Sequence, residues 1–271
     1  MEYLRGWRAL RNDPEWGSKL ITMSVILLVP LIGALVLIGW AALMLRRAVS
    51  GQDAPLPRMA FDMDYLGKLL QIGFKGYLAQ LLWSLPITVL SMVFGCCLYI
   101  GMGGMVGAVA AGGAAGGEAG AGLGALGALC LFGGFFIAFF ALIMVLAMPI
   151  RIAVMRAELT DDLNSAMRFK DVVDTTKMLF KELLIGHFVM MLVQFVAMLF
   201  AICTLYLGLL PALVVLRIVH TYFSAELYQV YLQKGGQPLP VGPLDVEGGN
   251  LPPTPPGPQQ PQHWGGPPAQ F

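Results

Sequence analysis

At residues 123–150 the sequence reads LGALGALCLFGGFFIAFFALIMVLAMPI, a run in which no side chain carries a charge. The run belongs to a longer interval, from Gly76 to Ile150, that contains neither Lys nor Arg. A helix needs about 20 residues to cross the roughly 30 Å of hydrocarbon in a bilayer. The stretch is therefore long enough and apolar enough to predict membrane-embedded helix.

Four further apolar runs have a comparable length. With the first, they predict five embedded segments, at Leu20–Leu45, Leu78–Ile100, Leu123–Ile150, Leu183–Leu205 and Leu207–Tyr231. The chain is 57% hydrophobic and 12% charged, with a mean hydropathy of +0.72, whereas soluble domains are about 25% charged. We therefore expect an all-α fold over residues 1–234: a polytopic, multi-pass α-helical protein of the cytoplasmic membrane, with the lipid bilayer as its surroundings. The net charge of +1 gives no indication of a nucleic-acid partner.

Most of the cations fall in three groups, at residues 1–19, 46–75 and 151–181. The positive-inside rule places such groups together on the cytoplasmic face, but five full crossings would put the first group opposite the other two. Pro30 and Gly33 interrupt Leu20–Leu45 at its centre, and a re-entrant hairpin there would bring all three groups to one face. A single tilted helix with a proline kink is the alternative. The sequence leaves both open.

Each of the two basic loops contains an amphipathic stretch that leads into an apolar segment. At helical spacing the polar side chains of each stretch share one stripe: Asp64, Lys68, Gln71 and Lys75 in the first, and Asp174, Lys177 and Lys181 in the second. These patterns predict interfacial helices. The candidate contacts for anionic lipid are Lys68, Lys75, Lys177 and Lys181. A purely structural cytoplasmic collar is the alternative interpretation.

Glycine dominates residues 101–127, where Gly112, Gly116, Gly120 and Gly124 form a ladder of four-residue steps. Such a ladder lets membrane helices approach closely, which would make the segment an oligomerising zipper. Against this, glycine costs about 1 kcal/mol per helical residue relative to Ala, and Glu118 is unfavourable at membrane depth. We expect a glycine-rich external loop at about 101–122.

The last 37 residues, 235–271, are rich in proline, glycine and glutamine. This composition cannot bury enough apolar surface to offset the entropy of ordering. It predicts a disordered cytoplasmic tail. The stretch Pro252-Pro253-Thr254-Pro255-Pro256 could instead present a polyproline II ligand to a partner.

Motifs of catalysis and metal binding are missing from the sequence. Its cysteines, Cys96, Cys97, Cys130 and Cys203, lie in apolar runs without a CxxC pair or a histidine at zinc spacing. It contains no Walker loop, GxSxG elbow or HExxH motif. We therefore expect no enzyme activity, no metal and no cofactor.

One group of ionisable and polar residues lies within an apolar segment. Arg217, His220, Thr221 and Ser224 share one sector of the last predicted helix, and Gln194 in the preceding helix is a candidate partner. Because charge at membrane depth is expensive, such a group by default marks a pathway or a binding site. The alternative is that the hydrocarbon region ends near Arg217, whose side chain then reaches the interface.

Several short motifs occur together in the order typical of one family. They are Asp13-Pro14-Glu15-Trp16, Val29-Pro30-Leu31-Ile32-Gly33, Arg46-Arg47, Pro55-Leu56-Pro57, Ser84-Leu85-Pro86, Pro149-Ile150-Arg151, Ala166-Met167-Arg168-Phe169 and Gly208-Leu209-Leu210-Pro211. Through them the chain resembles an uncharacterised prokaryotic integral membrane family, domain of unknown function 4013, up to about residue 234. The resemblance implies a bacterial or archaeal plasma-membrane protein, and it supplies no activity, cofactor or catalytic residue.

Two functional hypotheses follow. The first is a non-enzymatic membrane scaffold or partner-binding component, which would contact a protein partner or form a homo-oligomer. The second is a small-solute or ion transporter or channel that uses the Arg217 and His220 face of the last segment.

Overall fold

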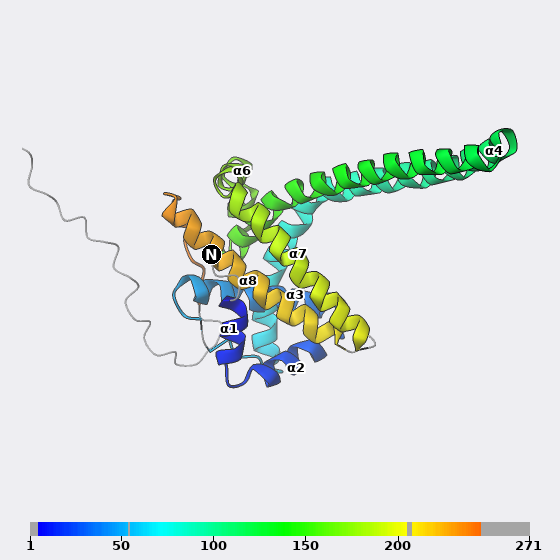
Figure 1. Cartoon of the computed structure of the whole chain (residues 1–271). Helices are drawn as coiled ribbons and strands as arrows, with labels where there is room; N and C mark the ends of the chain where they lie inside the picture. Colours follow the sequence, from blue (N-terminus) through cyan, green and yellow to red (C-terminus); the bar gives the residue numbers. More distant parts are fainter. Residues whose placement is uncertain (1–4, 54, 205–207, 245–271) are drawn as a thin grey trace, which may run out of the picture.

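The computed structural model describes residues 5–53, 55–204 and 208–244, apart from the side chains at 98, 100 and 102–132. This part of the chain is helical between short connections and contains no strand (Figure 1). Its helices are α1 (Arg5–Asn12), α2 (Trp16–Ile26), α3 (Pro30–Val49), α4 (Met63–Thr160), α5 (Leu163–Met167), α6 (Phe169–Met178), α7 (Phe180–Cys203) and α8 (Leu209–Gln233).

The described helices contain five stretches that are long and apolar enough to cross a membrane. These are Pro30–Val49, Met63–Cys97, Gly133–Thr160, Phe180–Cys203 and Leu209–Gln233. They overlap the five apolar runs of the sequence, so the predicted all-α fold with five such segments is confirmed. The amphipathic stretches also lie where they were expected: the first forms the beginning of α4, and the second forms α6 and the start of α7.

The first apolar run forms a helical hairpin from α2 and α3. Pro30 occupies the first position of α3, where its missing N–H costs no hydrogen bond, and residues 27–29 make the turn. At the open end, Nζ of Lys19 donates to the carbonyl of Leu56 at 2.9 Å. The beginning of α2 therefore lies beside the chain that follows α3. The structure thus divides Leu20–Leu45 into two helices at Pro30, while re-entry of this hairpin into the membrane stays a prediction.

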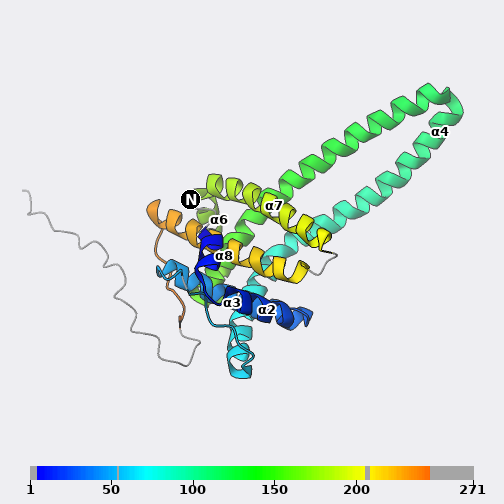
Figure 2. The same ribbon diagram turned by 60° about the horizontal axis from the view of Figure 1, so that its bottom comes forward.

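α4 runs out from the body of the molecule and returns beside itself, as Figure 1 and Figure 2 show. We call residues 63–97 its outgoing arm and residues 133–160 its return arm. Phe94 and Phe139 stack with their ring centroids 3.4 Å apart, which connects the arms. The glycine-rich segment lies between them, and its side chains are outside the described residues. The backbone at 101–122 belongs to α4, where the sequence predicted an external loop, and the glycine zipper stays a prediction.

The body is built around the crossing of α3 with the outgoing arm. A side chain at Gly39 of α3 would meet the backbone of Leu69, and one at Gly73 of the arm would meet that of Leu35. Residues without side chains let two helix backbones approach this closely. Trp40, the next residue of α3, is 1% exposed. This crossing fixes the base of the arms. On the body, α8 packs against α3.

Arg5 joins α1 to the body through two ion pairs, beside the buried side chains of Ala9 and Leu10. Arg5 donates to Asp53 at 2.7 Å and to Glu226 at 2.8 Å, so it joins α1 to the loop after α3 and to α8. The hydrogen bond to Asp53 raises the pKa of Arg5 above its ordinary value. The guanidinium therefore keeps its charge over the accessible pH range.

The chain that leaves α8 runs back along the body. The backbone N–H of Gly242 donates to the carbonyl of Leu159 at 2.8 Å, and Arg46 donates to the carbonyl of Pro243 at 3.1 Å. Residues 235–244 of the predicted disordered tail thus pack against the helical domain. The rest of that tail, 245–271, lies outside the described residues.

Candidate functional site

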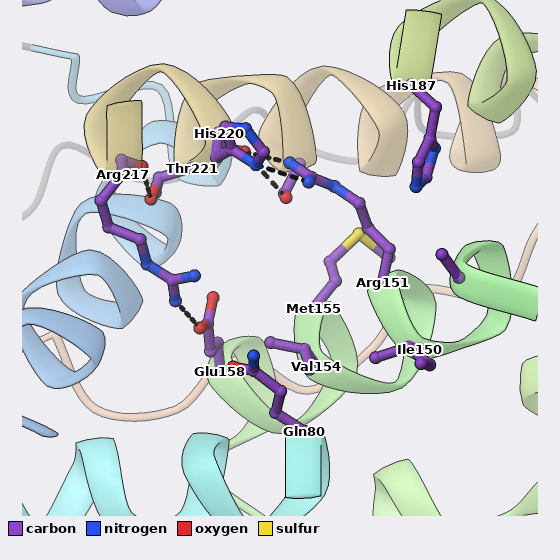
Figure 3. A pocket seen from close by; sticks show the side chains of 12 residues that line it. Gln80, Ile150, Arg151, Val154, Met155, Glu158, His187, Arg217, His220 and Thr221 are labelled. Carbon is purple, nitrogen blue, oxygen red and sulfur yellow. Dashed lines mark hydrogen bonds and ion pairs between the residues drawn. The ribbon is translucent and has the colours of Figure 1, made fainter. Parts of the chain in front are cut away.

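A cavity of about 220 Å³ lies between the two arms of α4, α7 and α8 (Figure 3). The return arm and α8 supply most of its lining, while α7 and the outgoing arm supply one residue each. Its polar and ionisable lining residues are Gln80, Arg151, Glu158, His187, Arg217, His220, Thr221 and Ser224. Ionisable groups gathered between helices of membrane-spanning length mark a candidate binding site, because their burial is expensive without a functional partner.

Glu158 of the return arm and Arg217 of α8 form an ion pair across the cavity. Glu158 is 5% exposed, and Nε of Arg46 donates to its backbone carbonyl at 2.8 Å. A buried carboxylate needs such a partner, since removing one member of a buried pair leaves an uncompensated charge. The pair therefore both joins α8 to α4 and neutralises the carboxylate of the cavity.

Arg151 lies seven residues before Glu158, two turns away on the same face of the return arm. One of its terminal nitrogens lies 2.6 Å from Nδ1 of His220, and the other donates to the His220 carbonyl at 2.9 Å. A guanidinium can only donate, so Nδ1 must accept. A neutral His220 ring then carries its hydrogen on Nε2. Arg151 thus fixes the tautomer of His220.

Three N–H groups of the lining are buried without a hydrogen-bond partner among the described residues: Nε of Arg151, Nε of Arg217 and Nε2 of His220. Each unpaired buried donor costs about 1–3 kcal/mol. Glu158, the carboxylate of the lining, is already paired with Arg217. Two guanidinium groups against one carboxylate give the lining a formal charge of +1 when both histidines are uncharged. A surplus of donors and of positive charge suits an anionic ligand.

Four of the five polar residues predicted from the sequence line this cavity: Arg217, His220, Thr221 and Ser224. The hydroxyls of Thr221 and Ser224 donate to the carbonyls of Arg217 and His220, at 2.8 and 3.0 Å. The two hydroxyls therefore present acceptor lone pairs rather than donors.

Gln194, the fifth predicted residue, lines an adjoining cavity of about 320 Å³. Arg151, His187 and His220 line both cavities. The structure thus places the predicted residues around two adjacent cavities, and Gln194 lines a different one from Thr221 and Ser224.

Four residues of the site could not be assigned to it from the sequence: Gln80, Arg151 and Glu158 of α4, and His187, which lies in the predicted segment Leu183–Leu205. A signal for two of them was present. Arg151 and Glu158 stand seven residues apart at the end of a long apolar run, which places them on one face of a helix. That this face meets Arg217 and His220 depends on helix packing, which spacing does not specify.

The candidate lipid-contacting lysines lie apart from the cavity. Lys68, Lys177 and Lys181 are exposed. Lys75 instead donates to the carboxylate of Asp161 at 2.9 Å, and its side chain is 42% exposed. Lys75 is thus part of the packing between the arms of α4, while contacts of the four lysines with lipid headgroups stay a prediction.

No group of three or more His, Cys, Asp or Glu residues in the described part could hold a metal ion. Cys96, Cys97 and Cys203 are exposed and carry no disulfide. Within the cavity, the carboxylate that could act as a base is held by a guanidinium.

The model of one protein family, described as a protein of unknown function (DUF4013), matches residues 22–223. The match covers most of the chain, and the chain belongs to this family. The resemblance seen in the sequence is therefore confirmed. Neither a curated protein nor a solved structure shows a significant match.

Proposed function

We propose that this member of the DUF4013 family is a multi-pass protein of the cytoplasmic membrane that binds an anionic ligand in the cavity between α4, α7 and α8. It acts as a binding component and not as an enzyme. The observation that carries the proposal is the set of three buried, unpaired N–H groups, on Arg151, Arg217 and His220, around one cavity. An oxyanion would satisfy them with charge-assisted hydrogen bonds.

The positive charge of the lining supports an anion over a cation. A cation would meet two guanidinium groups, and the nearest carboxylate, Glu158, is already engaged by one of them. His187 keeps a free lone pair on Nε2, because its Nδ1 donates to the Leu183 carbonyl. The other two possible bases of the lining are engaged, which supports a binding role: Nδ1 of His220 accepts from Arg151, and the Glu158 carboxylate accepts from Arg217. Neither group is available to abstract a proton from a ligand. A protein partner or a homo-oligomer, as predicted from the sequence, would be additional to this site.

The first test is thermal unfolding of the full chain in a neutral detergent with increasing inorganic phosphate. Because binding to the native state stabilises it, phosphate should raise the unfolding midpoint of the wild type until the site is saturated. Arg151→Gln and Arg217→Gln should each weaken the apparent affinity about tenfold or more, since hydrogen bonds to charged groups contribute about 1.5–3 kcal/mol.

Arg11→Gln is the matched control, because Arg11 is exposed on α1 and does not line the cavity. It should titrate like the wild type. An equal phosphate response in Arg11→Gln, Arg151→Gln and Arg217→Gln would remove the cavity from anion binding.

Transport of the bound anion is the second candidate function. The helices that line the cavity favour transport, because α7, α8 and both arms of α4 are long and apolar enough to cross a membrane. In vesicles that contain the purified protein, replacing Arg217 and His220 by Leu should abolish uptake of labelled phosphate. A measurable uptake that survives the double replacement would exclude this cavity from the transport path.

A further inference from the structure

The adjoining cavity differs from the polar one in its walls. Its apolar lining comes from the return arm, α7 and α8: Phe140, Met144, Met190, Met191 and Phe223. Arg151, His187 and His220 stand at the boundary, because they line both cavities. A cationic, donor-rich cavity and an apolar cavity therefore lie next to each other and share these three side chains.

The apolar part lies on the side of the molecule that would face lipid. Along the return arm Phe136, Ile137 and Val145 are exposed, and along α7 so are Phe188 and Phe195. Exposed side chains of this size on helices of membrane-spanning length belong in hydrocarbon. The apolar cavity between these two helices is thus open to hydrocarbon chains rather than to water.

The boundary residues also lie at a depth that suits a lipid headgroup. α7 begins at Phe180, and its first turn carries Glu182, which pairs with Lys234 at 2.9 Å. This charged end belongs in the interfacial layer. His187 follows seven residues after Phe180, about 10 Å deeper along a helix that rises 1.5 Å per residue. The headgroup region is about 5–8 Å thick on each side of the bilayer. His187 therefore lies just below it, where headgroups and acyl chains meet.

From these three features we infer that the ligand is a lipid with an anionic headgroup. The headgroup occupies the polar cavity, where Arg151, Arg217 and His220 supply the unpaired donors, and one acyl chain follows the apolar cavity between the return arm and α7. The inference rests on the proposed function and deepens it, because it names the class of ligand of the same site. A free anion such as phosphate would use the polar cavity alone.

The lining favours anionic over zwitterionic lipids. The formal charge of +1 in the polar cavity is balanced by a phosphodiester with an uncharged head, whereas a choline head would bring its own cation beside two guanidinium groups. The acyl chain adds little affinity, because it leaves one apolar surrounding for another. It decides instead which molecules fit.

The test uses the full chain in nanodiscs of phosphatidylcholine that carry a trace of phosphatidylglycerol with a photoactivatable acyl chain. After illumination, the labelled peptides should contain Phe140–Met144 and Met190–Gln194. The same photoactivatable chain on phosphatidylcholine should label these peptides about tenfold less, which is the expected effect of one charge-assisted interaction.

Two variants narrow the apolar cavity from opposite walls, Met191→Trp on α7 and Met144→Trp on the return arm. Each should strongly reduce labelling by the phosphatidylglycerol probe and leave the stabilisation by inorganic phosphate unchanged. Met198→Trp is the matched control, because Met198 is 64% exposed on the same helix and lines neither of the two cavities. It should label like the wild type. A variant that fails to unfold cooperatively is replaced by the one on the opposite wall.

The outcomes separate the two proposals. Equal labelling by both lipid probes would overturn the assignment of a lipid ligand, and so would labelling of Met191→Trp equal to that of Met198→Trp. In either case, loss of phosphate stabilisation in Arg151→Gln would still support an anion site. Phosphatidylglycerol labelling that is unchanged in both Arg151→Gln and Arg217→Gln would overturn the lipid assignment as well. If phosphate stabilisation is also unchanged in these variants, the proposed function fails with it.

Discussion

At the scale of single residues, the site depends on how few of its donors are satisfied. The Glu158 carboxylate accepts a hydrogen bond from a terminal nitrogen of Arg217. Nδ1 of His220 accepts one from a terminal nitrogen of Arg151. Nε of Arg151, Nε of Arg217 and Nε2 of His220 have no hydrogen-bond partner in the described part of the chain. Native proteins pair the great majority of their buried polar groups. A cluster of exceptions around one cavity is therefore best explained by a ligand that supplies the acceptors.

Replacing Glu158 gives the sharpest distinction between an anion site and a cation site. Glu158→Gln keeps the shape of the side chain, removes the carboxylate that competes for Arg217, and raises the formal charge of the lining from +1 to +2. We expect the variant to be less stable without ligand and to bind inorganic phosphate about tenfold more tightly than the wild type. Isothermal titration calorimetry would measure this. Weaker phosphate binding, or binding of a cation that Glu158→Gln abolishes, would contradict an anion site.

At the scale of helices, the α2–α3 hairpin is closed by a buried ion pair. Nζ of Lys19 lies 2.8 Å from Oδ2 of Asp13, and the two residues are 5% and 1% exposed. The same Asp13 oxygen accepts from the backbone N–H of Leu56 at 2.8 Å. The start of α2 is thus attached to the loop that follows α3.

Lys19→Met should therefore destabilise the hairpin strongly. The substitution leaves the Asp13 carboxylate buried without its cation, which typically costs about 3–5 kcal/mol. Thermal unfolding in detergent should show the loss, whereas Lys68→Met, at an exposed position of the outgoing arm, should change the midpoint little. An equal effect of the two substitutions would mean that the pair contributes nothing to the hairpin.

The crossing of α3 with α4 makes a second prediction at this scale. A side chain at Gly39 would meet the backbone of Leu69, whereas Gly67, earlier in the same arm, has open space around it. We expect Gly39→Val to force the helices apart and to cost about 3 kcal/mol. Gly67→Ala should be neutral or slightly stabilising, since alanine favours helix over glycine. Chemical unfolding would compare them, and a Gly39→Val variant as stable as the wild type would exclude close contact at this crossing.

The sequence predicts the helices better than it predicts the contacts between them. Apolar runs of about 20 residues placed the five segments, and Pro30 indicated a break in the first, because both are local properties of the chain. The choice between hairpin and kinked helix could not be made, since it depends on Lys19 meeting Leu56. Arg217 and His220 were recognised because charge in an apolar run is conspicuous. Their partners Glu158 and Arg151 were missed because helix packing brings them together.

At the scale of the whole molecule, the hairpin resolves the conflict between five apolar segments and the distribution of cations. With α2 and α3 folded back on each other, the first group of cations lies on the same side as the loop after α3. α7 ends at Cys203 and α8 begins at Leu209, at the end of these helices that lies away from Lys234 and Glu182. We therefore expect the N-terminal region and both basic loops on the cytoplasmic face, in agreement with the positive-inside rule.

Cysteine labelling in intact cells tests this arrangement. Single cysteines at Ser18, Ser50 and Asn164, in a chain without its native cysteines, should react with a membrane-impermeant maleimide only after the membrane is opened. A chain that keeps Cys203, the last residue of α7, as its one cysteine should react from outside. Labelling of Ser18→Cys from the face opposite Ser50→Cys would rule out the hairpin as a re-entrant element.

The most direct test of the central claim, an anion held by Arg151, Arg217 and His220, is a crystal structure of the full chain grown in lipid and soaked with selenate, a stand-in for phosphate. Anomalous scattering would locate the selenium without reference to any expected position. We predict a peak in the polar cavity with an oxygen within hydrogen-bond distance of Nε2 of His220. Selenate at exposed lysines and absent from the cavity, or a cation beside Glu158 in its place, would contradict the account.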